Sequence, residues 1–536
     1  MSMAADAKDL LIRELKDSVS EQRQMNKTLR AALENSNNQV AELTIQIQLL
    51  NEQLEYMKRK LFGRSSEKHA AETDGQLTLF DEPEKEEPAI LPAAEIPVKS
   101  HVRKPKATFE EKTKNLPVER IEVPLPEEDQ FCSVCGTHLE VIGKEVVRKE
   151  LEYIPATLKV VEYVSIHYGC PQCKQDAEKP NIIHSPVPPS LLGSYASPST
   201  VAWVIYQKYV NGLPLYRQEK DWLQYGFALS RTTMANWVIS CAITYLKVLY
   251  DYCHRLLVER GFAMADETPV QVLKEEGRDA TAKSYMWLFR SGEDGTPPII
   301  LYHYAPTRSG NTASEFLKGF RGYLMVDGYT GYNKVKDIKR CCCFAHIRRY
   351  FFDAIPKGKQ RDISNPAVQG VEYCDKLFAY ERHFKEKGYS YKQIKNGRLK
   401  HEKPVIEAFL VWLEKQTPVR GSKFATAVSY ALNRRDLMMT YLEDGRCSLS
   451  NNLSEQKMKS FVTGRKGWLF CDTPEGAEAS AIAYSFAEMA SANHLNVFKY
   501  IKYLLEQRPD ENMKDSELEK LMPWNEEVIE LCKLEN

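Results

Sequence analysis

Apolar residues recur at a seven-residue spacing from residue 9 to residue 63. Positions a and d of this heptad are apolar at 12 of 15 places, from Ile12 to Leu61, and no Pro or Gly interrupts it before Gly63. Such a repeat is typical of a coiled coil, so residues 9–63 are predicted to oligomerise the chain. Asn26, at an a position, suits selection of register or oligomer state. A single amphipathic helix packed on its own protein is the alternative.

The pattern changes over residues 64–118, which are rich in Pro, Glu, Lys and Ala. Little of this segment could be buried, so a flexible linker is predicted. Residues 187–258 then read as helical, with a break at Gly226 and Ser230 as an N-cap. Two helices joined by a short turn are compatible with a helix-turn-helix, in which Arg231, Thr232 and Asn236 would face DNA. Helix pairs are common, so an ordinary packed pair is the alternative.

Short apolar runs separated by polar residues follow from residue 259. The first predicted strand ends at Asp266, before a turn at Thr268–Pro269. Further strands are predicted at 284–290 and at 297–305, in the apolar run that ends at Asp327, and around Cys341–Cys343. A helix is predicted at 312–320 and another after Cys343. This order is that of an RNase H-like domain, in which the first and fourth strands are neighbours. The core is predicted at 259–355 and 441–510, with a helical insertion at 356–440.

Asp266 and Asp327 would therefore meet at adjacent strand ends. Two adjacent carboxylates repel unless a cation lies between them, and Mg²⁺ prefers such oxygen ligands. Glu455 is the best third acid for a two-metal site that acts on phosphodiesters. Its alternative role is a helix cap, because Asn452-Leu-Ser-Glu455 resembles an N-cap with an acid three residues later. Glu267 would point to the other face if its strand continues.

Several basic stretches are candidates for DNA contact. One follows the third acid and consists of Lys457, Lys459, Arg465 and Lys466. A second runs from Arg382 to Lys403, with Phe384, Tyr389 and Tyr391 interleaved. These residues could hold phosphates, or they could form charged, solvated helix faces. The C-terminal tail, 511–536, belongs to an acidic segment that is predicted to cover another surface of the protein.

Two cysteine pairs precede the helical segment. Cys132 and Cys135 form one CxxC, and Cys170 and Cys173 form the other. Two such pairs can complete a tetrahedral four-sulfur zinc site, so residues 119–186 are predicted to be a zinc ribbon with a structural Zn²⁺. Alternating apolar residues from Leu158 to Ile166 predict strands between the pairs. Reduced cysteines in a small core are the alternative.

Composition limits the remaining possibilities. The 536 residues include 73 basic and 73 acidic ones, so any DNA contact must come from local patches. The chain has thirteen cysteines, which is an odd number and too few in a chain of this length to indicate a disulfide scaffold. No leader and no apolar run of the roughly 20 residues that a membrane helix needs are visible, so a cytoplasmic protein is expected.

Motifs along nearly the whole chain resemble the insertion-sequence-sixty-six family of bacterial transposases, a branch of the Asp-Asp-Glu transposases. They are KRKLFGRSSEK (58–68), the cysteine pairs, LPLYRQE (213–219), ADETPVQVL (265–273), LMVDGYTGYN (324–333), FAHIRRYFFDA (344–354) and NNLSEQ with GRKGWLF (451–456, 464–470). Two departures are Ser450, where the family usually has Asp, and Phe344, where it usually has Trp.

The resemblance implies a DNA transposase that cuts element ends and joins them to target DNA with Mg²⁺ or Mn²⁺. It implies catalytic acids at Asp266, Asp327 and Glu455, and zinc ligands at the four cysteines. Double-stranded DNA, further copies of the chain and small accessory proteins from the same element are the expected partners. An RNase H-like nuclease, a zinc-ribbon regulator without catalysis, and a transposase relic that binds without cutting are the alternatives.

Overall fold

A computed structural model describes residues 22–28, 30, 158–165, 167–169, 182–184, 189–358 and 362–534. The chain forms two compact units. Of the described residues, we call those from 158 to 343 and from 444 to 534 the core unit, and those from 344 to 443 the helical unit. Residues 22–28 and 30 are helical. The rest of the predicted coiled coil, the predicted linker and all four zinc-ligand candidates lie outside the described residues.

Residues 158–165 do not form the strand that their alternation predicted. They have no regular secondary structure, and Val160, Val161, Tyr163 and Val164 are all exposed. Alternation favours a strand only where one face is buried, and no buried face exists here. A short antiparallel pair, β1 (His167–Gly169) with β2 (Ile182–His184), is the only sheet among the described residues before residue 189.

The predicted helical segment is helical from residue 198 to residue 258, whereas residues 189–197 form no helix. It contains α3 (Pro198–Tyr209), α4 (Leu215–Gln224), α5 (Arg231–Cys241) and, after a π-helical turn at Ala242–Leu246, α6 (Lys247–Val258). Ser230 caps α5, since its hydroxyl accepts from the backbone N–H of Thr233. Gly226 ends the turn after α4 at a φ of +76°, a conformation that glycine adopts without strain.

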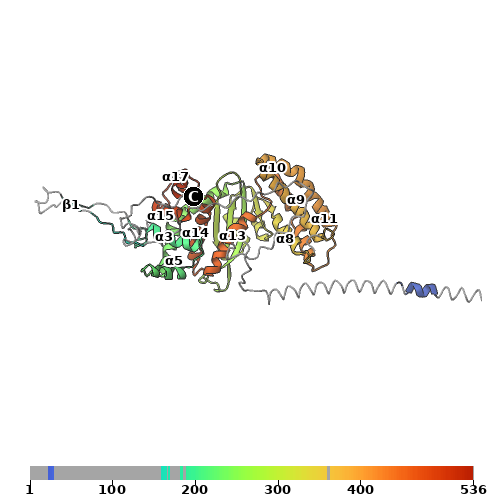
Figure 1. Cartoon of the computed structure of the whole chain (residues 1–536), viewed down its shortest axis with the longest axis horizontal. Coiled ribbons are helices and arrows are strands. Elements are labelled where there is room, and N and C mark those ends of the chain that lie inside the picture. Colours follow the sequence, from blue (N-terminus) through green and yellow to red (C-terminus); the bar gives the residue numbers. More distant parts are fainter. Residues whose placement is uncertain are drawn as a thin grey trace, which may run out of the picture. The chain divides into compact units, whose positions relative to one another are not determined.

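A five-stranded mixed sheet forms the centre of the core unit (Figure 1). Its order is β5-β4-β3-β6-β7, with β3 parallel to β6, β6 parallel to β7, and the other pairs antiparallel. The predicted RNase H-like order and the pairing of the first and fourth strands are confirmed. The elements are β3 (Phe262–Gln271), β4 (Lys283–Ser291), β5 (Ile300–Ala305), α7 (Gly310–Phe316), β6 (Tyr323–Val326), η4 (Thr330–Lys334) and β7 (Lys339–Cys342).

The predicted turn at Thr268–Pro269 is wrong, because β3 continues through both residues to Gln271 and pairs with β4 throughout. β6 pairs with β3 only over Phe262–Met264. From residue 265 to residue 270 no strand pairs with this side of β3, so a proline interrupts no ladder there. Pro269 is exposed there. Asp266 therefore lies within a strand, at the place where one of its two neighbours ends.

The edge strand β5 is covered by helices, which satisfy its outer backbone groups. The N–H of Tyr302 donates to the Ser485 hydroxyl of α14 (Pro474–Ala492) at 2.8 Å, and the Tyr250 hydroxyl of α6 donates to the Tyr302 carbonyl at 2.7 Å. The Tyr302 hydroxyl itself donates to the Lys457 carbonyl of α13 (Asn452–Trp468). These bonds prevent β5 from pairing with another chain and tie three helices to one strand.

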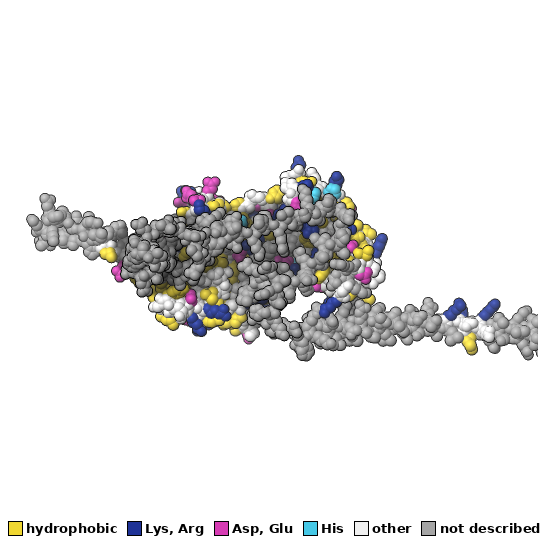
Figure 2. All heavy atoms as spheres, viewed as in Figure 1, with side chains coloured by type: hydrophobic (Ala, Val, Ile, Leu, Met, Phe, Trp, Pro, Cys, Tyr) yellow, Lys and Arg dark blue, Asp and Glu magenta, His cyan; other side chains and the backbone are white. Residues whose placement is uncertain are grey.

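The acidic C-terminal tail packs on the core unit. After α15 (Val497–Gln507), the chain forms α16 (Asp515–Leu518), a short 3₁₀ turn and α17 (Glu526–Cys532). Leu521, Met522 and Val528 are buried in the same core as the sheet. Acidic side chains gather on the surface where Figure 1 labels α17 (Figure 2). The apolar residues thus hold the tail in place while its acids face outward.

The helical unit contains α8 (Phe344–Asp353), α9 (Pro366–Glu386), α10 (Tyr391–Gly397), α11 (Lys403–Glu414) and α12 (Lys423–Leu432). Its basic stretch is not all available to DNA. Arg398 is 2% exposed and pairs with Glu381 at 2.7 Å, and its guanidinium lies over the ring of Tyr441. Burial without such a partner would be costly, so Arg398 is a core residue of this unit. No helix among the described residues has the length and apolarity to cross a membrane.

Gly322 permits the close approach of β3 and β6. A Cβ on Gly322 would lie 2.3 Å from the carbonyl oxygen of Gly261, well inside contact distance. We expect Gly322→Ala to lower the free energy of unfolding by roughly 1–3 kcal/mol, measured by urea denaturation. Gly476→Ala, in α14, is the control. Its Cβ would meet only ordinary contacts, with Thr473 at 3.5 Å and Ile239 at 3.9 Å, so it should leave stability unchanged or raise it. Equal stability of wild type and Gly322→Ala would contradict this account of the strand pair.

Candidate active site

The register of β3 and β6 brings two acids to one point. Phe262 pairs with Tyr323 and Met264 with Met325 in parallel. Continuing this register by two residues places Asp266 opposite Asp327, which directly follows β6. Both side chains lie where the carboxyl end of β6 leaves the sheet, and both residues are partly exposed. An ion or a substrate can therefore reach them.

The electrostatics of Asp266 reflect the presence of further acids. Its pKa is raised to about 8, mainly by burial and in addition by the charges of Glu267, Asp327 and Glu455. The backbone N–H of Glu267, which donates to an Asp266 oxygen at 2.9 Å, opposes these effects. The other two predicted acids thus both act on Asp266, although they are far from it in sequence.

Glu455 comes from the first turn of α13. The alternative reading of Glu455 as part of an N-cap at Asn452 is wrong in detail, because the N-cap is Asn451, and its side chain makes no capping bond. Asn451 instead is fully buried and donates from Nδ2 to the carbonyl of Ala265 at 2.9 Å, next to Asp266. Its own carbonyl accepts from the Glu455 N–H at 3.1 Å. One residue therefore connects the backbones that carry the first and third acids.

Two further contacts hold the start of α13. The N–H of Asn451 donates to the Cys343 sulfur at 3.2 Å, and Arg290 of β4 donates to the Leu453 carbonyl at 3.2 Å. Ser450, where the resembled family usually has Asp, contributes backbone groups that bond the Ser448 hydroxyl. The loop before Glu455 is thus anchored without an acid at position 450.

Glu267 has a separate role from the three acids. Its side chain is 1% exposed and pairs with Arg308 at 2.5 Å, and it also accepts from the Tyr332 hydroxyl. The Arg308 guanidinium lies 4.1 Å from the centre of the Tyr329 ring, and the Tyr329 N–H donates to Asp327 at 2.8 Å. Burial raises the pKa of Glu267, against the effect of these bonds. Glu267 therefore anchors the loop after Asp327 to β3.

The basic residues after Glu455 differ in availability. Lys459 and Lys466 are exposed, and Arg465 is partly exposed with one nitrogen 3.5 Å from the Thr268 hydroxyl. Lys457 forms an ion pair with Glu488 at 2.6 Å and is 23% exposed. On α5, Arg231, Thr232 and Asn236 are all exposed. The backbone N–H of Arg231 donates to Glu219 of α4, which links the two helices.

Three family models match the chain. The model described as "Transposase IS66 family" matches residues 193–479, more than half of the chain. The chain belongs to the IS66 transposase family. The model described as "zinc-finger binding domain of transposase IS66" matches residues 129–174, and "Transposase C of IS166 homeodomain" matches residues 49–121. The family thus combines an Asp-Asp-Glu (DDE) catalytic domain with a zinc finger and a leucine-zipper-like N-terminal domain.

Curated relatives carry no functional name. "Uncharacterized protein y4jD" of Sinorhizobium fredii is 28% identical over 429 residues, which cover 77% of this chain and 81% of the relative. "Uncharacterized protein y4qI" of the same organism is 28% identical over 430 residues, which cover 76% of each chain. The similarity therefore extends through most of the chain.

The donor chemistry fits the metals that the family implies. The DDE domain implies a divalent ion, and the zinc-finger domain implies zinc. Asp266, Asp327 and Glu455 supply only oxygen donors, and their mutual repulsion is the condition that a bound Mg²⁺ or Mn²⁺ relieves. Cys132, Cys135, Cys170 and Cys173 all lie within the zinc-finger match but outside the described residues.

Sequence reasoning missed Asn451, Arg290 and the pair of Glu267 with Arg308. Asn451 was visible only as one of two adjacent asparagines, and nothing in the sequence separates it from the exposed Asn452. Arg290 and Arg308 are single basic residues in unremarkable surroundings. Their roles depend on contacts across 41 to 163 residues of chain, which no local pattern encodes.

Removal of the Asp266 charge should have opposite effects with and without metal. We expect Asp266→Asn to stabilise the metal-free protein by roughly 1–3 kcal/mol, because it removes a repelled, partly buried carboxylate. The same variant should lose the rise in melting temperature that Mn²⁺ gives the wild type. Thermal melts with and without Mn²⁺ measure both effects. Asp337→Asn, an exposed acid in a loop, is the control and should behave as wild type; a wild-type Mn²⁺ response in Asp266→Asn would refute the metal site.

Asn451 is a positioning residue, and its loss should loosen Glu455. We expect Asn451→Ala to weaken Mn²⁺ binding at least tenfold and to lower the free energy of unfolding by roughly 1–3 kcal/mol, since it leaves the Ala265 carbonyl without its donor. Isothermal titration with Mn²⁺ measures the first effect and urea denaturation the second. The matched control is Asn452→Ala, which changes the neighbouring exposed residue. If Asn451→Ala loses stability but binds Mn²⁺ normally, Asn451 supports only the fold.

Proposed function

We propose that this chain cuts DNA at the ends of its element and joins the freed ends to target DNA. The observation that carries this proposal is the placement of Asp266 and Asp327 at adjacent positions of an RNase H-like sheet, with the charges of Asp327 and Glu455 both acting on Asp266, in a chain of a DDE transposase family. Both reactions are phosphodiester displacements, and they differ in the nucleophile. Water attacks in the cut, and the freed 3′ hydroxyl attacks in the joining step.

The three acids would hold Mg²⁺ or Mn²⁺. When bound, such ions lower the pKa of a water and stabilise the leaving 3′ oxygen. The chain's own task is then to keep the carboxylates in position and open to DNA. Asn451 fixes Glu455 relative to β3, and Glu267 with Arg308 and Tyr332 fixes the loop after Asp327. Because the two steps share these groups, one centre serves both.

DNA would be held by basic and polar groups around this centre. Lys459, Arg465 and Lys466 on α13 are suited to phosphates, and Lys457 is less suited because Glu488 already pairs with it. Arg231 and Asn236 on the exposed face of α5 are proposed to contact the element ends. The coiled coil would hold two copies together so that two ends are processed in one assembly. Small accessory proteins of the same element are proposed as further partners.

Asp327→Asn tests the catalytic assignment. With a labelled duplex of the element end and Mg²⁺ or Mn²⁺, we expect the wild type to nick the strand and Asp327→Asn to reduce nicking at least a hundredfold, because one metal ligand is lost. Binding on a native gel should be unchanged. Asp337→Asn, ten residues later, should nick as the wild type does. Normal nicking by Asp327→Asn would overturn the assignment, and a wild type that shifts the DNA without nicking it would favour a regulator.

A further inference from the structure

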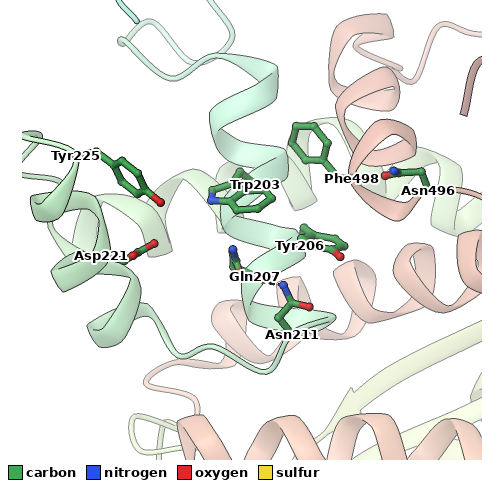
Figure 3. Close-up of a pocket in the computed structure, with 8 residues that line it drawn as sticks. All are labelled: Trp203, Tyr206, Gln207, Asn211, Asp221, Tyr225, Asn496 and Phe498. Atoms are coloured by element: carbon green, nitrogen blue, oxygen red, sulfur yellow. Dashed lines mark hydrogen bonds between the residues drawn. The ribbon is translucent and has the colours of Figure 1, made fainter. Parts of the chain in front are cut away.

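A groove crosses one face of α3, and none of the three acids lines it. Its volume is about 540 Å³. Trp203, Tyr206 and Gln207 of α3 form the floor, Asp221 and Tyr225 of α4 one wall, and Phe498 of α15 lies on the other side (Figure 3). Residues 203, 206 and 207 occupy one helix face, since side chains three and four residues apart lie together. The groove therefore exists because α4 and α15 flank this face.

Aromatic rings dominate the floor. Trp203 stacks on Tyr206 with ring centres 5.6 Å apart, and its edge meets Phe498 at 5.7 Å. Tyr225 is 39% exposed, and its hydroxyl points toward Trp203 in Figure 3. The electron-rich faces of such rings attract cations, most strongly at tryptophan.

Asp221 gives the groove its charge. Its carboxylate points toward the floor near Gln207 (Figure 3), and the residue is partly buried. Within residues 189–358 and 362–534, the side chain of Asp221 makes no hydrogen bond and no ion pair. None of the residues that line the groove is Lys or Arg. An aromatic floor beside an acid without a partner is complementary to a positive charge.

We propose that this groove binds an arginine side chain of a partner polypeptide. A guanidinium can stack on the ring of Trp203 while it donates two parallel hydrogen bonds to Asp221. An apolar ligand would leave the carboxylate covered and unpaired, which is unfavourable. A nucleobase could also stack here, but its strand would bring phosphates beside Asp221 and meet no basic lining residue. Charge complementarity thus favours a protein partner over nucleic acid at this site.

The test uses the full chain and a fluorescein-labelled peptide, Gly-Ser-Gly-Arg-Gly-Ser-Gly, followed by fluorescence anisotropy and by quenching of tryptophan emission. We expect saturable binding that weakens at least tenfold when citrulline, a neutral isostere, replaces the arginine. Asp221→Asn should weaken binding of the arginine peptide by a similar factor, and Tyr225→Leu should also weaken it. Asp251→Asn, which removes a different exposed carboxylate of the core unit, is the control and should bind as the wild type does.

Circular dichroism melts verify that each variant is folded. If Tyr225→Leu does not fold, the isosteric variant Asp221→Asn still tests the proposal. Equal binding of the arginine and citrulline peptides would overturn the proposal, as would no binding of either. A labelled single-stranded oligothymidine forms the second arm. If it binds in a manner that depends on Asp221 and Tyr225 while the peptide does not, the groove is a nucleobase site and the proposal fails. None of these readouts requires DNA cleavage.

Discussion

Repulsion between carboxylates is the constraint around which the core unit is arranged. The parallel pairing of β3 with β6 places Asp266 opposite Asp327, and α13 adds Glu455 to the same field. Such a cluster opposes folding unless a cation offsets it. The surrounding structure holds the acids together nonetheless, through a sheet whose edge strand is bonded to α6, α13 and α14. The stability of the scaffold thus maintains an arrangement that is unfavourable in the absence of a metal.

The supporting contacts divide between the two sides of the acid cluster. On one side, the buried pair of Glu267 and Arg308, with Tyr332, orders the loop that follows Asp327. On the other, Asn451 and Arg290 hold the first turn of α13 against β3 and β4. Each acid therefore projects from backbone that is fixed by a neighbour in space rather than in sequence. Precise placement of this kind is what the proposed cutting and joining of DNA at one centre would require.

Periodicity in the sequence predicted the order of strands and helices, because each element of the core has a buried face that imposes a regular apolar pattern. The three acids were chosen as candidates because the sequence pattern placed each at the end or the start of such an element. Pro269 misled the prediction of β3, because an open strand side tolerates a proline that local rules read as a turn. Residues 158–165 gave the opposite error. Their apolar residues alternate and so predicted a strand, but the segment has no buried face and forms none. Asn451 and Arg290 could not be found, because their partners are set only by the tertiary fold.

The contact between Asn451 and Cys343 has a consequence for how this architecture can diversify. The chain leaves the core unit after Cys343, and the N–H of Asn451, soon after its return at residue 444, donates to the Cys343 sulfur. The two ends of the inserted segment 344–443 therefore lie side by side. For this reason, the length of the insertion does not determine the position of Glu455. Relatives could lengthen, shorten or exchange this insertion without moving the three acids. The helical unit would then be free to evolve new contacts.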